Sequence, residues 1–189
     1  MRGDPDKGGA ALIIIINGPS GSGKTTLGNY FKTLGLHELV STTTRPPRNM
    51  EVEGVSYYFV TEEEFNKIDM IEQSEYSGNR YGLSRQEVES KLKLGDVFAS
   101  LDKNGVKRLR EIFPAEVIVI YLMVSESQLK SRMFERGDPV ENIMKRLKHS
   151  KETDEDQNIH LADYVINNNG DLNELYAEGR RILEEAGLI

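Results

Sequence analysis

The feature that most constrains this chain is a glycine-rich segment that directly follows an uninterrupted aliphatic run. Residues 12–16 are aliphatic and rich in β-branched side chains, which indicates a strand buried on both faces, as in a parallel sheet. Over residues 24–34 the apolar side chains recur at helical spacing. Residues 18–25, between the two, fit the pattern G-x-x-x-x-G-K-[ST], which is typical of phosphate-binding loops in this strand-to-helix context.

This loop predicts a site for a nucleoside triphosphate. A glycine-rich turn lets backbone N–H groups converge on phosphate oxygens, and the positive end of the following helix adds to their attraction. We expect Lys24 to reach the β- and γ-phosphates and Thr25 to hold a Mg²⁺ ion that bridges them. The alternative, a glycine-rich turn without a ligand, is disfavoured because motif and context agree. The predicted phosphate-binding residues are Gly18, Pro19, Ser20, Gly21, Ser22, Gly23, Lys24, Thr25 and Thr26.

Strands and helices alternate along most of the remaining chain. The predicted strands are residues 96–101, 117–124 and 164–166, and the predicted helices are residues 105–112, 125–136, 139 to about 153, and 171–186. This alternation predicts an α/β fold of the P-loop type, with a parallel sheet, right-handed crossovers and helices on both faces.

Residues 38–95 interrupt the alternation, and we interpret them as a small inserted lobe. Its predicted elements are strands at 40–44 and 55–60, a turn-rich segment with short strands at 70–82, and helices opened by capping boxes at Thr61/Glu64 and Ser84/Glu87. The predicted core then comprises residues 11–37 and 96–189, with a mobile helical lid at about 126–158. Residues 1–10 are predicted to be a disordered leader.

Composition narrows the class of partners. The chain of 189 residues has a formal net charge of -7, so no global positive field attracts a nucleic-acid backbone. Its longest apolar runs, residues 10–16 and 117–124, are far shorter than the roughly 20 residues of a membrane-spanning helix. There is no cysteine, so any metal should have oxygen ligands. We expect a cytoplasmic protein, a monomer or a homodimer, that binds neither nucleic acid nor membrane.

A second set of polar residues predicts a site for a smaller phosphate. Arg45 and Arg48 flank a proline pair, and Glu51 and Tyr57 follow. Guanidinium groups present a planar fork of donors that matches phosphate oxygens, and a tyrosine hydroxyl adds another donor. Taken alone, two loop arginines are more often solvated surface charges, so this interpretation depends on the neighbouring phosphate-binding loop.

Three segments together closely resemble the guanylate kinase family. They are the glycine-rich loop, the run Thr-Thr-Arg-Pro-Pro-Arg at 43–48 with Glu51-x-x-Gly-x-x-Tyr-x-Phe-Val after it, and Ile71-Glu72 with Tyr76-x-Gly-Asn-x-Tyr-Gly after it. The segments occur in the family's order and spacing, and the resemblance extends from Leu12 to the last predicted helix. It implies phosphoryl transfer from ATP, with Mg²⁺, to GMP or dGMP.

The resemblance also implies roles for particular residues. The matches to the family's GMP-binding positions are Ser41, Arg45, Arg48, Glu51, Tyr57, Glu72, Tyr81 and Asp102. Of these, Arg45, Arg48, Tyr57 and Tyr81 would hold the phosphate, and Ser41, Glu72 and Asp102 would read the base. A carboxylate such as Glu72 accepts from both guanine N1–H and the exocyclic amine, a pattern that adenine lacks. The alternatives are a surface role for Glu72 and core packing for the tyrosines.

The lid is implied to supply charge for the transfer itself. Arg132 and Arg136 lie four residues apart and so share a helix face, and Arg146 lies on the next helix. With Lys24 and Arg45 they form the implied catalytic set, because the transferred phosphoryl group carries spread negative charge. The alternative for each lid arginine is an ordinary surface ion pair. Asn167 matches a position that contacts adenine, and a turn-forming role is equally consistent with the sequence.

Three departures from the family pattern bear on selectivity. Leu83 stands where the family usually offers a hydroxyl to the base, although Ser84 is adjacent, and Ser100 stands where it usually has the first of two carboxylates. The lid is one residue shorter between Arg136 and Arg146. Two alternatives therefore remain: a kinase of this scaffold that acts on another phosphorylated small molecule, and a non-catalytic protein-interaction module. A P-loop switch would leave the second arginine site unexplained.

Overall fold

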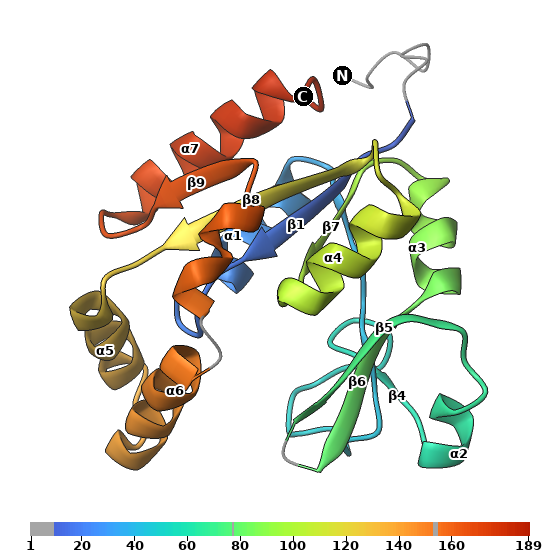
Figure 1. The fold of residues 1–189 in the computed structure, drawn as a ribbon, viewed down its shortest axis with the longest axis horizontal. Helices are drawn as coiled ribbons and strands as arrows, with labels where there is room; N and C mark the ends of the chain where they lie inside the picture. Colours follow the sequence, from blue (N-terminus) through green and yellow to red (C-terminus); the bar gives the residue numbers. More distant parts are fainter. Residues whose placement is uncertain (1–9, 77, 153–154) are drawn as a thin grey trace.

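The computed structural model describes residues 10–76, 78–152 and 155–189, so nearly all of the predicted leader lies outside the described residues. The core is a five-stranded sheet in the order β2-β7-β1-β8-β9, and every pair of neighbours is parallel (Figure 1). The strands are β1 (Ile13–Asn17), β2 (His37–Glu38), β7 (Val97–Ser100), β8 (Val117–Met123) and β9 (Tyr164–Asn167). The predicted parallel α/β fold is confirmed.

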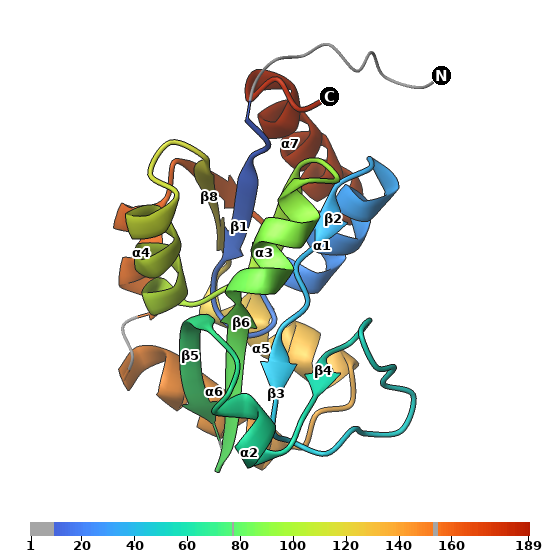
Figure 2. The same ribbon diagram turned by 90° about the vertical axis from the view of Figure 1, so that its right-hand side faces the viewer.

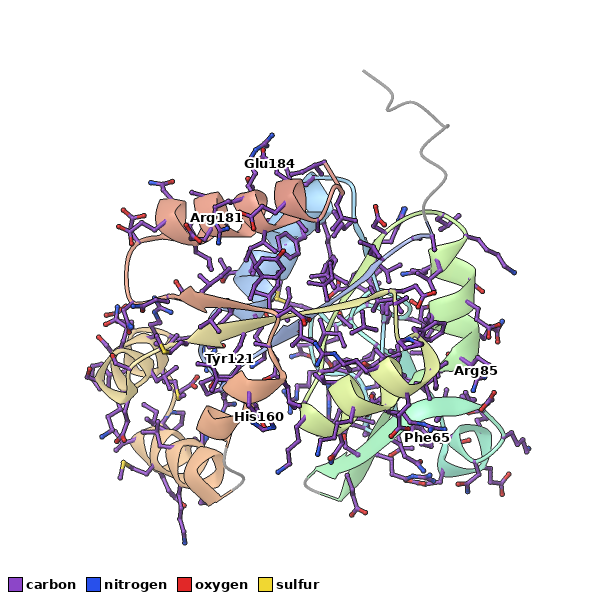
Figure 3. The ribbon with its side chains drawn as sticks, turned by 45° about the horizontal axis from the view of Figure 1, so that its top comes forward. Phe65, Arg85, Tyr121, His160, Arg181 and Glu184 are labelled. Carbon is purple, nitrogen blue, oxygen red and sulfur yellow. The ribbon has the colours of Figure 1, made fainter. Side chains whose placement is uncertain are left out.

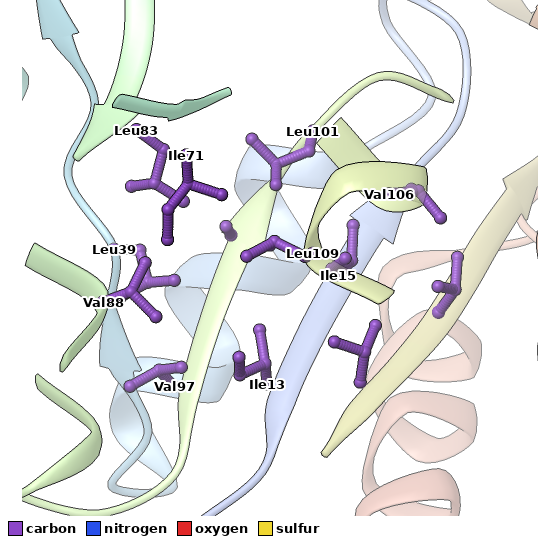
Figure 4. Close-up of a cluster of buried hydrophobic side chains, with 13 residues drawn as sticks. Ile13, Ile15, Leu39, Ile71, Leu83, Val88, Val97, Leu101, Val106 and Leu109 are labelled. Atoms are coloured by element: carbon purple, nitrogen blue, oxygen red, sulfur yellow. The ribbon is translucent and has the colours of Figure 1, made fainter. Parts of the chain in front are cut away.

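The aliphatic run of β1 forms the centre of two hydrophobic layers because its side chains alternate between the faces of the sheet. Ile13 and Ile15 pack with residues of α3 and α4, in the cluster drawn in Figure 4. Ile14 and Ile16 pack on the other face with α1 and α7. All four side chains are fully buried, which stabilises the fold by about 1.5–3 kcal/mol each.

The helices lie close to their predicted positions. They are α1 (Lys24–Thr33), α2 (Glu62–Phe65), α3 (Arg85–Leu92), α4 (Lys103–Ile112), α5 (Glu126–Glu135), α6 (Val140–Glu152) and α7 (Leu172–Glu185), with a 3-10 helix at Glu155–Leu161. Helix α7 buries Ile182 and Leu183 against the sheet and carries Arg181 and Glu184 on its outer side (Figure 3). No helix in the described part of the chain is long and apolar enough to cross a membrane.

A second sheet, in the order β4-β3-β6-β5, lies within residues 42–84. Its strands are β3 (Thr42–Thr43), β4 (Tyr58–Phe59), β5 (Met70–Tyr76) and β6 (Asn79–Ser84). The predicted strand at 55–60 was too long, since only Tyr58 and Phe59 pair with β3, and Tyr57 makes an isolated bridge to Glu53. The short strands predicted within 70–82 are confirmed but are longer than expected, because β5 and β6 form a continuous antiparallel hairpin from Met70↔Ser84 to Tyr76↔Asn79.

The starts of three helices differ from the predictions made from the sequence. The Thr61/Glu64 capping box is confirmed, whereas Ser84 accepts from Glu87 N without the reciprocal bond. Helix α4 starts at Lys103 rather than residue 105, because the Asp102 carboxylate accepts from its first free N–H groups. Asp138, directly before the predicted helix at 139 to about 153, accepts a hydrogen bond from Arg136.

The second sheet and the helices α5 and α6 project from the same end of the core. Figures 1 and 2 place both at the end of the sheet where β1 and β8 finish, on opposite sides of the loop that follows β1. In parallel α/β sheets, ligands bind at the carboxyl ends of the strands. A ligand-binding site is therefore expected at this end of the molecule.

Candidate active site

The loop between β1 and α1 enters the helix through a glycine whose conformation and surroundings exclude a larger side chain. Gly23 is the N-cap residue of α1, has φ 102°, and provides no side-chain hydrogen bond to the helix. A Cβ at this position would lie 2.6 Å from Asn168 Nδ2, so a larger residue would displace that amide. The unsatisfied N–H groups and the positive end of the helix dipole make this end of α1 an anion site.

Lys24 folds back over the same loop. Its Nζ donates to Gly18 O at 2.6 Å and to Pro19 O at 2.9 Å. The ammonium group therefore lies over the loop that the sequence predicts to hold phosphates. A hollow of about 540 Å³ opens beside the ammonium group. Its lining includes residues of the loop, of α5 and of the segment after β9, namely Ser20, Gly21, Gly23, Lys24, Thr25, Thr26, Arg132, Arg136 and Asn168.

The three predicted lid arginines converge on this loop by different contacts. Arg132 Nη2 donates to Asn168 O at 2.8 Å, and Arg146 Nη1 donates to Ser20 Oγ at 3.2 Å. Arg136 is bonded to Asp138, which also lies 3.7 Å from Arg146, and the Arg136 guanidinium holds the pKa of the Asp138 carboxyl below its usual range. Asp138 thus keeps two of the arginines together.

Asn168 is a residue that the sequence reasoning missed. It is 4% exposed, its Nδ2 donates to Ser22 O at 2.7 Å, and it lines the hollow beside Lys24. Its neighbour Asn167, the predicted adenine contact, is exposed, and its Oδ1 accepts from Asn169. The three consecutive asparagines in the sequence indicated a polar segment here. Burial alternates from Ile166 on β9 through Asn167 to Asn168, and this alternation decides which asparagine side chain points inward.

A second hollow joins the phosphate-binding loop to the lobe. It has a volume of about 180 Å³, and its lining includes Lys24, Thr25, Ser41, Tyr57 and Ser100. Two predicted phosphate-binding residues and two predicted GMP-binding residues thus face one cavity, although they lie far apart in the sequence. Ser100, at the position of the missing carboxylate, lies in the same lining.

Arg45 is the centre of a separate cluster on the lobe. Its Nη1 and Nη2 donate to the two oxygens of Glu51 at 3.0 and 2.8 Å, and its guanidinium lies 5.5 Å from the centre of the Tyr57 ring. Tyr57 and Tyr81 pack edge to face at 5.9 Å. Glu51 also accepts from Arg48 N at 2.7 Å, and the bond from Arg45 lowers the pKa of the Glu51 carboxyl.

This arrangement suits an anion. The Nε of Arg45 is buried and has no hydrogen-bond partner among the described residues. A buried donor without a partner is costly, so an incoming anion would gain from pairing with it. The Arg48 side chain is exposed at the edge of the cluster. Glu51 therefore holds the Arg45 guanidinium in place, and as a carboxylate it is not itself suited to bind an anion.

Glu72, on β5, is half-buried and close to Asp102. Burial raises the pKa of the Glu72 carboxyl to about 7, the negative charge of Asp102 adds to the rise, and a backbone hydrogen bond from Leu83 opposes it. The Leu83 side chain is fully buried in the core, and the Ser84 hydroxyl caps α3. Neither side chain thus replaces the hydroxyl that the family pattern offers to the base.

The oxygen donors near the loop fit a magnesium ion that arrives with a nucleotide. The Thr25 side chain is exposed and borders both hollows. Within the described residues, no group of three or more His, Cys, Asp or Glu side chains could hold a metal ion. Mg²⁺ keeps several waters and often takes only one or two protein oxygens besides phosphates. A Thr25 hydroxyl beside bound phosphates meets that requirement.

A phosphate-binding loop after the central strand of a parallel sheet defines a P-loop α/β protein, and the lobe and arginine lid are the parts that a kinase of small phosphorylated substrates requires. Comparison with protein-family models matches residues 10–186 to guanylate kinase. The chain belongs to the guanylate kinase family.

Individual relatives agree with this assignment. Guanylate kinase of Thermus thermophilus is 37% identical over 169 residues, which is 86% of this chain and 75% of that protein. Guanylate kinase of Halalkalibacterium halodurans is 34% identical over 165 residues, 83% of this chain and 80% of the relative. The crystal structure of guanylate kinase from Anaplasma phagocytophilum superposes with a TM-score of 0.70 at 29% identity and covers 95% of this chain and 87% of that one.

Proposed function

We propose that this enzyme transfers the γ-phosphoryl group of ATP to GMP or dGMP and releases ADP and the corresponding diphosphate. The observation that carries the proposal is the cavity whose lining contains both Lys24 and Thr25 of the phosphate-binding loop and Ser41 and Tyr57 of the lobe. A donor phosphate at the loop and an acceptor on the lobe would meet there. No covalent enzyme intermediate is needed, because one oxygen of the acceptor phosphate attacks the γ-phosphorus directly.

The triphosphate would lie on the loop before α1. Backbone N–H groups of the loop would bind the β- and γ-phosphates, and Lys24 would exchange its bonds to Gly18 O and Pro19 O for bonds to phosphate oxygens. Thr25 would hold Mg²⁺, which supplies charge neutralisation between the β- and γ-phosphates when bound. Asn168 keeps the loop in place from the side of β9.

The acceptor would lie on the lobe. Arg45, Arg48, Tyr57 and Tyr81 would bind the GMP phosphate, with Glu51 holding Arg45. Ser41, Glu72 and Asp102 would read guanine. The ionised Glu72 carboxylate accepts from two guanine N–H groups, and a base that lacks one of these donors leaves a half-buried acceptor unpaired.

Transfer then depends on position and charge. Arg132, Arg136 and Arg146 lie around the loop and would neutralise the charge that spreads over the phosphoryl oxygens in the transition state. Closure of the lobe and of the lid at about residues 126–158 over the two nucleotides would exclude water, which otherwise hydrolyses ATP. We also propose that the enzyme acts in purine nucleotide metabolism in the cytoplasm, as a monomer or homodimer.

A comparison of nucleoside monophosphates as phosphoryl acceptors tests the proposal. ADP release from Mg-ATP is measured with GMP, dGMP, IMP, AMP, CMP, UMP and no acceptor. We expect ADP chiefly with GMP and dGMP, and a loss of about 10²–10³ in kcat for Lys24→Ala, with Lys107→Ala on the outer face of α4 as the unaffected control. Silence with every acceptor would refute GMP as the substrate and leave another phosphorylated acceptor or a non-catalytic module.

A further inference from the structure

Glu87 is a buried carboxylate on α3 that the proposed chemistry does not use. Its side chain is 7% exposed. One oxygen accepts from Val40 N at 2.9 Å and lies 3.0 Å from Lys91 Nζ, and the other accepts from the Tyr58 hydroxyl at 3.1 Å. A carboxylate is costly to bury unless its oxygens are paired. Here the partners come from three separate segments, so Glu87 is a fixed junction between them.

Two of these segments, the chain after β2 and helix α3, are the connections between the core and the lobe, and the third is β4 of the lobe sheet. Val40 lies on the chain that leaves β2 for β3, and α3 is the segment that returns from β6 to β7. Lys91, one turn after Glu87, donates to Glu38 O at 2.6 Å on the same outgoing chain. Figure 2 shows α3 between the lobe sheet and the core. Helix α3 thus forms two hydrogen bonds with the outgoing connection, one at Val40 N and one at Glu38 O.

The junction lies directly behind two predicted substrate contacts. Ser41 and Tyr57 line the cavity beside Lys24. The next residue along the chain in each case, Thr42 and Tyr58, lines a different hollow together with Glu87. Successive side chains of a strand point to opposite faces. A bond from Tyr58 N to Ser41 O, 2.9 Å long, joins the two segments, so holding their back faces sets the position of their front faces.

We propose that Glu87 is a positioning residue for the acceptor nucleotide: it fixes Val40 and Tyr58 from behind, and thereby sets Ser41 and Tyr57 on the face that binds GMP. The inference rests on the proposed function, since the affected substrate is GMP. The triphosphate site is made by other elements, the loop before α1, the lid and the β9–α7 connection. Loss of Glu87 should therefore act on one substrate and spare the other.

The test separates the Michaelis constants of the two substrates. Glu87→Ala leaves Val40 N and the Tyr58 hydroxyl without their acceptor, and we expect the KM for GMP to rise about tenfold. The KM for ATP and the kcat at saturating GMP should stay within about twofold, because neither depends on this junction. Glu87→Gln should restore the KM for GMP, because its amide oxygen still accepts from Val40 N and its amide nitrogen can donate to the Tyr58 oxygen.

Two further variants keep the test decisive. Glu89→Ala changes an exposed carboxylate on the same helix and should leave both constants unchanged. Tyr58→Phe removes only the hydroxyl and should raise the KM for GMP about threefold; it decides the matter if Glu87→Ala does not fold. An unchanged KM for GMP in these variants, or an equal rise in both constants, would overturn the inference. Wild-type protein that is inactive with GMP would instead overturn the proposed function.

Discussion

In the proposed mechanism, Glu72 links the protonation of one side chain to the choice of substrate. Its carboxyl has a pKa of about 7, raised by burial and by Asp102. The neutral form predominates below that pH, and it no longer offers two negatively charged acceptor oxygens to the guanine N–H groups. Recognition of the base should therefore weaken as the pH falls through 7 and strengthen as it rises.

The pH dependence of kcat/KM for GMP measures this directly, since it reports groups of the free enzyme. We expect kcat/KM for GMP to fall by up to about tenfold per pH unit below the pKa of Glu72. Glu72→Gln is the reference, because it cannot ionise and shares the titration of the GMP phosphate with the wild type. Parallel profiles for the two proteins would show that Glu72 does not control recognition.

Residues of the site differ in how far the sequence alone could place them. Lys24 and Thr25 were predictable because the loop is a local structure whose pattern fixes their geometry. Arg45 was predictable as an anion-binding candidate, but its bonds to Glu51 depend on how the loop folds back. The sequence predicted Glu87 only as one half of a capping box with Ser84, and the bond from its side chain is not formed. Its actual side-chain partners, Val40 and Tyr58, lie 47 and 29 residues away and could not be predicted from local sequence.

Among the elements, those with local signals were predicted best. The core strands β1 and β8 are continuous aliphatic runs, and Asp171 caps the start of α7 as its position suggests. The full length of the hairpin of β5 and β6 was underestimated because its polar sequence has no strand periodicity, and its strands are defined by pairing with each other and with β3. Tertiary pairing decides such segments.

The connection between β9 and α7 gives a test with a built-in control. Asn168→Ala removes the bond to Ser22 O and leaves a buried carbonyl unpaired, so we expect the free energy of unfolding to fall by about 1–3 kcal/mol. The KM for ATP should rise roughly tenfold. Asn167→Ala, at the exposed neighbour, should change both quantities little. Thermal unfolding and ATP titrations would decide, and a larger effect of Asn167→Ala on the KM would identify Asn167 as the nucleotide contact.

At the scale of the whole molecule, the proposed donor and acceptor sites lie on different parts of the fold. The loop before α1 and the arginine lid surround one hollow, the lobe carries the Arg45 cluster, and a smaller cavity lies between them. The chain at residues 39–41 and helix α3 connect lobe and core, and Glu87 joins them through its bond from Val40 N. In the proposed reaction, the γ-phosphoryl group passes directly from the nucleotide on the core to the nucleotide on the lobe.

Transfer of label from ATP that carries ³²P in the γ position tests that claim most directly. With GMP present, we predict that the label appears in GDP in a one-to-one ratio with ADP, and that little inorganic phosphate forms with or without GMP. Label released as inorganic phosphate regardless of GMP would indicate a nucleotide-hydrolysing switch and contradict direct transfer. Label that stays in ATP under all conditions would contradict catalysis altogether.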